Sequence, residues 1–209
     1  MRSGLSSAER RFDRRPRVNY AGAMNVHPTA PTDPDAFLRW NEGREGKREL
    51  VNGRVIEMMT GGSRGHAILV SELAALLRAS VDRSKFLVLT SDLGVRTPAG
   101  IRYPDVVMET KGGSNRDLAA TGPILIAEVL SPSSLARDMV EKSAEYTALP
   151  ALLNYLVLAQ EEPRVWVWSR FTHGWSGPEM TEGTDGVVEL GLLQISIPLQ
   201  ALYADLLPG

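Results

Sequence analysis

The sequence contains no cysteine among its 209 residues. Disulfide bonds and thiolate metal sites are therefore excluded, and the composition fits a reducing compartment such as the cytoplasm. The chain also lacks any apolar run near the roughly 20 residues that a transmembrane helix needs. Its first 20 residues include several arginines but no apolar segment of the kind found in secretory signals. We therefore expect a cytoplasmic protein without a membrane partner.

Basic residues are scarce outside the N-terminal segment. Residues 1–24 contain six arginines and two acidic residues, whereas the rest of the chain has 17 basic and 23 acidic side chains, a net charge of about −6. We interpret residues 1–33 as a disordered basic leader and lead-in, with Met24 as the natural start, and residues 34–209 as a single domain. The leader could instead be an arm that touches nucleic acid. An acidic body argues against charge-driven nucleic-acid binding, but not against an enzyme that reaches phosphates through metal ions and a few local bases.

The order of the predicted elements is typical of an α/β domain. The predicted helices span 36–45, 66–83 and 132–149, the last opening at Pro132 with Ser133 or Ser134 as its cap. The predicted strands span 48–58 (a hairpin that turns at Asn52-Gly53), 86–96, 101–109, 123–130, 153–160 and 164–171. The strand–helix–strand step after residue 123 predicts a mixed sheet with a helix packed on its face.

One charged side chain interrupts the most apolar of these strands. In ILIAEVL, residues 124–130, Glu128 shares a predicted face with Ile124, Ile126 and Leu130. A buried carboxylate is costly unless it is paired, hydrogen-bonded or bound to a metal. Some partner must therefore face Glu128.

The following helix offers a lysine as that partner. Its inward stripe, at spacings of four and three residues, consists of Leu135, Met139, Lys142, Tyr146 and Leu149. A helix joined closely to its strand packs back on the sheet, so Lys142 and Glu128 could meet.

A second carboxylate lies on the preceding strand. Asp105 shares a predicted face with Tyr103 and Val107. Two strand carboxylates beneath a lysine suit a hard cation such as Mg²⁺, which would polarise a phosphoryl oxygen and activate water, while the lysine offsets developing charge. The alternative is a plain ion pair between Lys142 and Glu128, with Asp105 simply a residue at a strand start.

Three runs in this order resemble a known family: PDVV at 104–107, IAEVLSPSS at 126–134 and RDMVEKSAEY at 137–146. They are similar to the PD-(D/E)XK nuclease superfamily and, within it, to the bacterial Uma family of restriction-endonuclease-like proteins. The similarity covers about 47–171. It implies a restriction-endonuclease-like mixed central sheet flanked by helices, with additional β-hairpins. It also implies an endonuclease that uses Mg²⁺ or Mn²⁺ to hydrolyse phosphodiester bonds in DNA.

The resemblance also implies a set of site residues. Asp105 and Glu128 correspond to the acidic metal ligands, with the backbone carbonyl of Val129 as a third. In the superfamily the lysine lies two residues after the second acid, where this chain has Leu130; the family likeness places it at Lys142 instead.

Further residues are secondary candidates. Glu49 matches an acidic residue before the family's turn and is a further candidate carboxylate at the metal, or an ordinary strand residue beside Arg48 or Arg54. His66, at a helix start, could contact phosphate, orient a ligand or be structural. Ser131 could cap the helix or touch substrate, Arg102 could grip a phosphate or be solvated, and Tyr146 is expected in the core with its hydroxyl near the site. The chain departs from the family at Asn154 and at Ala159-Gln160, where acidic residues are common.

Two function classes remain. The first is a metal-dependent endonuclease, expected as a homodimer because duplex cleavage benefits from two sites. The second is a nuclease-like fold retained as a binding or interaction module without turnover. A carboxylate-pair glycosidase is disfavoured, since Lys142 would keep both acids ionised when one must carry a proton.

Overall fold

The structure is a computed structural model that describes residues 30–58, 60–130 and 137–207. The helices are α1 (Pro34–Asn41), α2 (Arg64–Ser80), the π-helix η1 (Arg137–Lys142), α3 (Ser143–Thr147), the 3₁₀ turn η2 (Gly191–Leu193), α4 (Leu199–Leu202) and η3 (Ala204–Leu206). The strands are β1 (Lys47–Val51), β2 (Arg54–Met58), β3 (Phe86–Thr90), β4 (Val95–Thr97), β5 (Gly100–Arg102), β6 (Val106–Thr110), β7 (Pro123–Val129), β8 (Asn154–Leu158), β9 (Arg164–Phe171), β10 (Gly174–Glu182), β11 (Val187–Leu190) and β12 (Ile195–Pro198). Among these described residues, no helix is long and apolar enough to cross a membrane.

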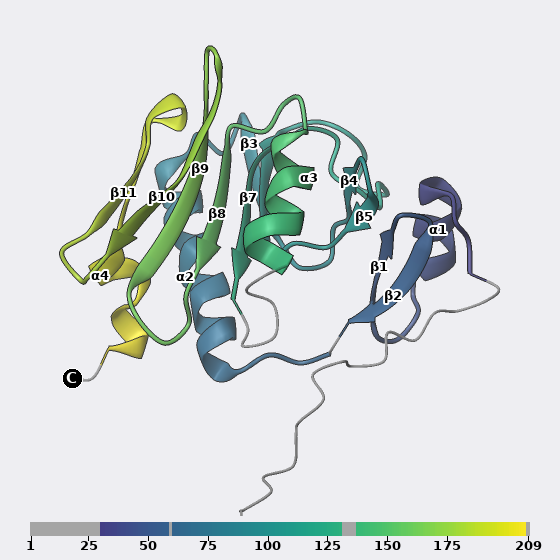
Figure 1. The fold of residues 1–209 in the computed structure, drawn as a ribbon, viewed down its shortest axis with the longest axis horizontal. Coiled ribbons are helices and arrows are strands. Elements are labelled where there is room, and N and C mark those ends of the chain that lie inside the picture. The colour runs from purple at the N-terminus through teal and green to yellow at the C-terminus, as the bar shows by residue number, and fades with distance from the viewer. Residues whose placement is uncertain (1–29, 59, 131–136, 208–209) are drawn as a thin grey trace, which may run out of the picture.

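A six-stranded mixed sheet forms the centre of the molecule, in the order β10-β9-β8-β7-β6-β3 (Figure 1). β7 and β8 are parallel, and the connection between them carries η1 and α3, as the strand–helix–strand pattern predicts. α2 packs on one face through Leu69, Leu73 and Leu77, and Tyr146 of α3 packs on the other. The predicted α/β fold with a mixed central sheet is confirmed.

A smaller sheet, in the order β2-β1-β5-β4, lies beside the central one. Its β1–β2 hairpin turns at Asn52-Gly53, where φ is 50° and 73°, as expected for a type I′ turn. Phe37 of α1 packs against Leu50 of β1 and Ile101 of β5. This sheet therefore has its own small core.

The prediction of continuous strands at 86–96 and 101–109 was wrong. Each is broken into two strands that belong to different sheets: β3 and β6 pair in the central sheet, while β4 and β5 pair in the smaller one. Ser91 leaves extended geometry with a φ of 56°, and Pro104 has no N–H to donate to a ladder. Asp105, a candidate site residue from the sequence, lies in the second break.

The helix predicted at 132–149 ends at Thr147, and its proposed start at Pro132 lies outside the described residues. Its first described part is a π-helix, a feature often found at functional sites. The described part of the expected stripe faces the sheet: Met139 and Leu149 pack on the same cluster as Tyr146, and Lys142 is buried. Leu135, the first member of the stripe, lies outside the described residues.

The predicted face of β7 needs one correction. Ile126 and Leu130 pack on the α3 side, as expected, but Ile124 packs on the α2 side. The β6–β7 register shifts between Met108 and Glu109, so Ile124 is an extra residue that breaks the alternation.

Candidate active site

Asp105 occupies the point where β6 and β7 stop pairing. The last registered pair is Val106 with Ala127, and beyond it the backbone N–H of Val129 donates to Asp105 Oδ2 at 2.8 Å. The side chain of Asp105 thus replaces the next rung of the ladder. Its other oxygen, Oδ1, accepts no hydrogen bond from any residue that the structure describes. One carboxylate oxygen therefore fixes the side chain while the other is left for a ligand.

His66 approaches the same carboxylate from the start of α2. Ser63 caps that helix and accepts the backbone N–H of His66 at 3.0 Å. The cap places the imidazole Nε2 3.2 Å from Asp105 Oδ2. The sequence predicted the helix start at His66 but not this contact, which joins residues 39 positions apart.

Glu128 is bound by two side chains of the crossover helix. Its Oε1 accepts hydrogen bonds from Lys142 Nζ at 2.8 Å and from the Tyr146 hydroxyl at 2.9 Å. All three residues are buried. The partner that the apolar strand required is therefore Lys142, as the helical stripe predicted, together with the hydroxyl of Tyr146.

Lys142 connects the two carboxylates electrostatically. Burial acts to raise the pKa of Asp105, but His66, the Val129 N–H and the charge of Lys142 outweigh it, and the pKa is lowered. Burial and the charge of Glu128 raise the pKa of Tyr146 well above its usual value. At neutral pH Asp105 is therefore an anion and Tyr146 is a neutral donor.

A second charged cluster is formed by Arg102, Glu49 and Glu145. Arg102 is 2% exposed and binds Glu49 Oε2 through Nη1 at 2.8 Å and Glu145 through Nε at 2.9 Å and through Nη2. Burial acts to lower the pKa of Arg102, but the bonds to Glu145 and the charge of Glu49 outweigh it and raise it. The interpretation of Arg102 as a solvated or phosphate-gripping side chain was wrong, because its charge is enclosed by two glutamates.

Glu49 lies in this second cluster. Oε2 binds Arg102, and Oε1 lies 3.4 Å from the backbone N–H of Tyr103, which donates to it. Neither alternative from the sequence, a metal carboxylate or a partner of Arg48 or Arg54, describes these contacts. Glu145, which was not among the candidates from the sequence, is the other half of the enclosure; its place next to Tyr146 was the available signal.

Gln160 was noted only as a departure from the family pattern. Its side-chain amide donates to the carbonyl of Leu130, and its Oε1 accepts from the hydroxyl of Ser63. Gln160 therefore ties the end of β7 to the cap of α2, close to both parts of the site. Ser131 lies outside the described residues.

The donor chemistry fits a magnesium-like ion. No three His, Asp or Glu side chains of the described residues converge as a preformed metal cage. Mg²⁺, however, is usually bound by one or two carboxylates together with waters and substrate phosphates. Asp105 Oδ1 and the carboxylate of Glu128 are oxygen donors of the right kind, and Val129 directly follows Glu128 in the chain.

A mixed sheet with a helix-bearing parallel crossover and a second hairpin sheet is the fold of a restriction-endonuclease-like α/β domain. The chain belongs to the Uma2 family, described as "Putative restriction endonuclease", whose family model matches residues 34–200. This confirms the resemblance seen in the sequence.

Relatives and a solved structure agree with this membership. Two proteins of Synechocystis sp. (strain ATCC 27184 / PCC 6803 / Kazusa), "Uncharacterized protein sll1609" and "Uncharacterized protein slr1290", are 33% and 30% identical over 129 and 138 residues. The matches cover 59% and 63% of this chain and 72% of each relative. A crystal structure from Anabaena variabilis ATCC 29413, described as "a putative nuclease belonging to DUF820", has a TM-score of 0.63 at 16% identity and covers 84% of this chain and 99% of its own. This last likeness concerns the fold alone.

Proposed function

We propose that this protein is a metal-dependent endonuclease that hydrolyses phosphodiester bonds in DNA, with Mg²⁺ or Mn²⁺ as cofactor. The observation that carries the proposal is the arrangement around Val129. Its N–H holds Asp105 by one oxygen only, and the preceding residue, Glu128, is bound by Lys142. Membership of the Uma2 family supports nuclease chemistry.

Each residue has a separate role in this proposal. Asp105 Oδ1, Glu128 and the Val129 carbonyl would hold the metal ion, which when bound polarises a phosphoryl oxygen and lowers the pKa of a water. His66 and the Val129 N–H keep Asp105 ionised and oriented through Oδ2. Lys142 offsets negative charge that develops on the phosphorus.

Three further residues act indirectly or lie outside the described part. Tyr146 holds Glu128 as a neutral donor. Glu49, whose two oxygens are both engaged, supports the site through Arg102. Ser131 stays a candidate substrate contact from the sequence alone.

Cleavage of supercoiled and linear DNA with Mg²⁺ or Mn²⁺ tests the proposal. Asp105→Asn and Lys142→Ala are each expected to lower the cleavage rate by about 10²–10³-fold, the usual loss when a charge-stabilising group is removed. Asp185→Asn and Lys47→Ala remove the same charges from exposed positions and should cut like the unmodified protein. Equal cleavage by all five proteins would refute the assignment.

Metal binding gives a readout that does not need turnover. Calorimetric titration with Mn²⁺ should show binding that Asp105→Asn weakens and Asp185→Asn does not. Thermal unfolding of each variant separates a lost ligand from a lost fold.

A non-catalytic binding module is the second candidate function. It is favoured by the enclosure of Glu128, whose Oε1 already accepts two hydrogen bonds, and by Leu130 at the superfamily's usual lysine position. Absence of both Mn²⁺ binding and cleavage of any nucleic acid, with DNA binding retained, would establish it over the first.

We further propose that the protein is a cytoplasmic homodimer. The absence of cysteine supports a reducing compartment, and a two-fold pair of sites suits the two strands of a duplex. Light scattering at working concentration would give the mass; a monomer would remove the second part of this proposal.

A further inference from the structure

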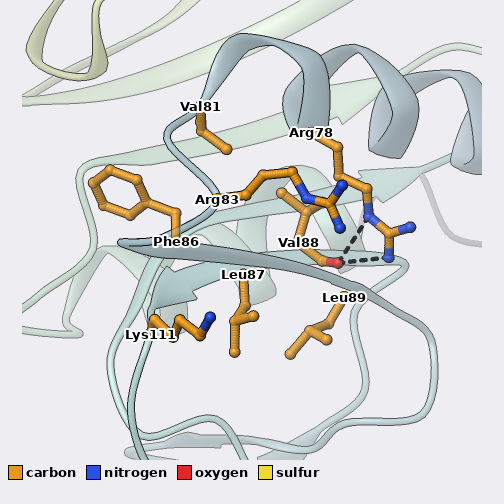
Figure 2. Close-up of a pocket in the computed structure, with 8 residues that line it drawn as sticks. All are labelled: Arg78, Val81, Arg83, Phe86, Leu87, Val88, Leu89 and Lys111. Atoms are coloured by element: carbon orange, nitrogen blue, oxygen red, sulfur yellow. Dashed lines mark hydrogen bonds between the residues drawn. The ribbon is translucent and has the colours of Figure 1, made fainter.

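A basic hollow lies at the outer edge of the central sheet, away from Asp105. It has a volume of about 370 Å³ and is formed between the end of α2 and the edge strand β3 (Figure 2). Its charged lining consists of Arg78, Arg83 and Lys111, and no acidic side chain of the described residues lines it. This is a concentration of positive charge on a body that carries about −6 in all.

The cations of the hollow are available to a ligand. Arg83 and Lys111 are exposed, and neither makes an ion pair within the described part of the chain. Lys85, by contrast, lies 3.4 Å from Asp82. Arg78 is held in place because its Nε and Nη2 donate to the carbonyl of Val88 at 3.3 and 2.9 Å (Figure 2). The hollow thus presents one anchored cation and two exposed ones to an anion.

The rest of the lining is apolar, and apart from the buried Val88 it is half-buried. Phe86, Leu87 and Leu89 contribute apolar surface beside the cations. Single-stranded nucleic acid is commonly bound by this combination, in which basic groups track the phosphates and aromatic or apolar surface receives the bases. An inorganic anion would use only the charges.

The edge strand also connects the hollow to the site. Thr90 at the end of β3 pairs with Val106, and the N–H of Ser91 donates to the backbone carbonyl of Asp105 at 3.1 Å. Phe86 and Thr90 are four residue steps apart along the strand, about 13 Å, which is the rise of about four nucleotides in a B-form strand. A strand whose phosphodiester lay at Asp105 would be long enough to reach the hollow.

An acidic peptide is the competing occupant, since an open sheet edge can accept an added strand. The carbonyl of Val88 is already taken by Arg78, so this edge lacks one of the acceptors that strand addition needs. Charge and apolar surface together, rather than free backbone, are what the hollow offers. The observations therefore favour nucleic acid.

We propose that the hollow formed by Arg78, Arg83, Lys111 and Phe86 binds the backbone and bases of a single nucleic-acid strand whose scissile phosphate lies at Asp105. The inference rests on the proposed function and extends it, because it assigns a second point of attachment for the substrate. It requires that several nucleotides beside the cut be unpaired, as in a locally opened part of a duplex.

The test measures binding of a fluorescein-labelled 20-nucleotide DNA by anisotropy, without divalent metal, at several salt concentrations. The double variant Arg83→Ala with Lys111→Ala is compared with Arg54→Ala with Lys47→Ala, which removes the same charges from exposed positions on the smaller sheet. The first pair should weaken binding on the order of tenfold and reduce the salt slope by about 0.7 for each phosphate that is no longer neutralised, whereas the second pair should change neither. Phe86→Leu keeps an apolar side chain but removes the aromatic ring, and it should weaken single-strand binding about fivefold or more while leaving duplex binding unchanged.

Other outcomes separate this inference from the proposed function. Cleavage of bis(p-nitrophenyl) phosphate, which is too small to span both points, should be the same for the Arg83/Lys111 variant and the unmodified protein. If DNA is cut but the two double variants bind it equally, the inference is overturned and the proposed function stands. If the variant Arg83→Ala with Lys111→Ala loses binding to a labelled oligoglutamate but binds DNA as the unmodified protein does, the inference is overturned in favour of a peptide site. If the protein cuts no nucleic acid but binds a DNA strand in a way that depends on Arg83 and Lys111, strand binding at the hollow is supported and the endonuclease function is refuted.

Discussion

Two charged clusters lie a few residues apart in this fold, and they differ in how completely their charges are enclosed. In the closed cluster, Arg102 is buried between Glu49 and Glu145. In the open cluster, which also contains Glu128, Lys142 and Tyr146, Asp105 is held by Val129 and His66 through a single oxygen, and Oδ1 has no hydrogen-bond partner among the described residues. Only Tyr103 and Pro104 separate Arg102 from Asp105 in the chain.

This difference is our reason for proposing that the Arg102 cluster is structural and that the Asp105 cluster is the ligand site. A buried ion is costly unless its hydrogen bonds are satisfied, and Arg102 satisfies this requirement within the protein. Only one of the two carboxylate oxygens of Asp105 is hydrogen-bonded within the described part of the protein. A charged group with a lowered pKa and an unused acceptor is typical of a ligand site. Both clusters contain buried charged side chains, so burial alone does not distinguish them.

The closed cluster also supports the open one. Glu145 is bound to Arg102, and the next residue in α3, Tyr146, donates to Glu128. The charge of Glu49 contributes to the raised pKa of Tyr146, so the two clusters are close enough to interact. Arg102 therefore anchors the helix that presents Tyr146 and Lys142.

Replacement of Arg102 is expected to give the largest loss of stability. Arg102→Met leaves the buried Glu49 and the half-buried Glu145 without their partner, which should lower the free energy of unfolding by about 3–5 kcal/mol. Urea unfolding followed by tryptophan fluorescence measures the change.

Arg96→Met provides the matched control, because Arg96 pairs with Asp35 at the exposed surface of the same sheet. That change should cost less than about 1 kcal/mol. If the two replacements cost the same, the distinction between a closed structural cluster and an ordinary ion pair fails.

Local pattern was sufficient for several elements. The Asn52-Gly53 turn, the amphipathic face of α2 and the inward position of Lys142 follow from turn chemistry and helical periodicity, and each is present. Those rules could not show that the strands at 86–96 and 101–109 change sheets. The breaks at Ser91 and Pro104 depend on which strands lie alongside, which is tertiary information.

The same reasoning applies to the site. Lys142 and Glu128 are 14 residues apart on consecutive elements, so periodicity could bring them together. Arg102 meets Glu49 on a neighbouring strand of the smaller sheet and Glu145 on a helix, at separations of 53 and 43 residues, and no local pattern carries that information. Sequence patterns therefore identified the charges of the open cluster and misassigned the enclosed arginine.

Removal of the Tyr146 hydroxyl is expected to have an intermediate effect. Tyr146→Phe keeps the buried ring and removes one hydrogen bond to the carboxylate of Glu128, which should lower the free energy of unfolding by about 1.5–3 kcal/mol. The same replacement in a Glu128→Gln background should cost less, because a neutral amide is a weaker acceptor. An identical cost in both backgrounds would show that the bond is not part of the open charged cluster.

Tyr203 gives the smallest effect and a reference outside both clusters. Its hydroxyl donates to the neutral carbonyls of Ala159 and Arg164 at 2.8 and 2.9 Å, so Tyr203→Phe should lower the free energy of unfolding at pH 7 by about 0.5–1.5 kcal/mol. Burial raises the pKa of Tyr203 from 10.0 to about 12. The hydrogen bond to the Arg164 carbonyl acts to lower this pKa, and the charge of Glu162 acts to raise it. Below pH 10 both folded and unfolded chains keep this proton, and the stabilisation is complete. Between pH 10 and about 12 the unfolded chain loses the proton first, so the stabilisation decreases as the pH rises.

The difference in unfolding free energy between the unmodified protein and Tyr203→Phe should therefore be constant up to about pH 10 and then shrink. Urea unfolding at a series of pH values measures it. If the unfolding free energies of the two proteins keep a constant difference up to about pH 12, the raised pKa of Tyr203 is contradicted. If Tyr203→Phe lowers the free energy of unfolding as much as Tyr146→Phe does, a carboxylate acceptor adds nothing over a carbonyl. Tyr146 would then not be part of the charged site.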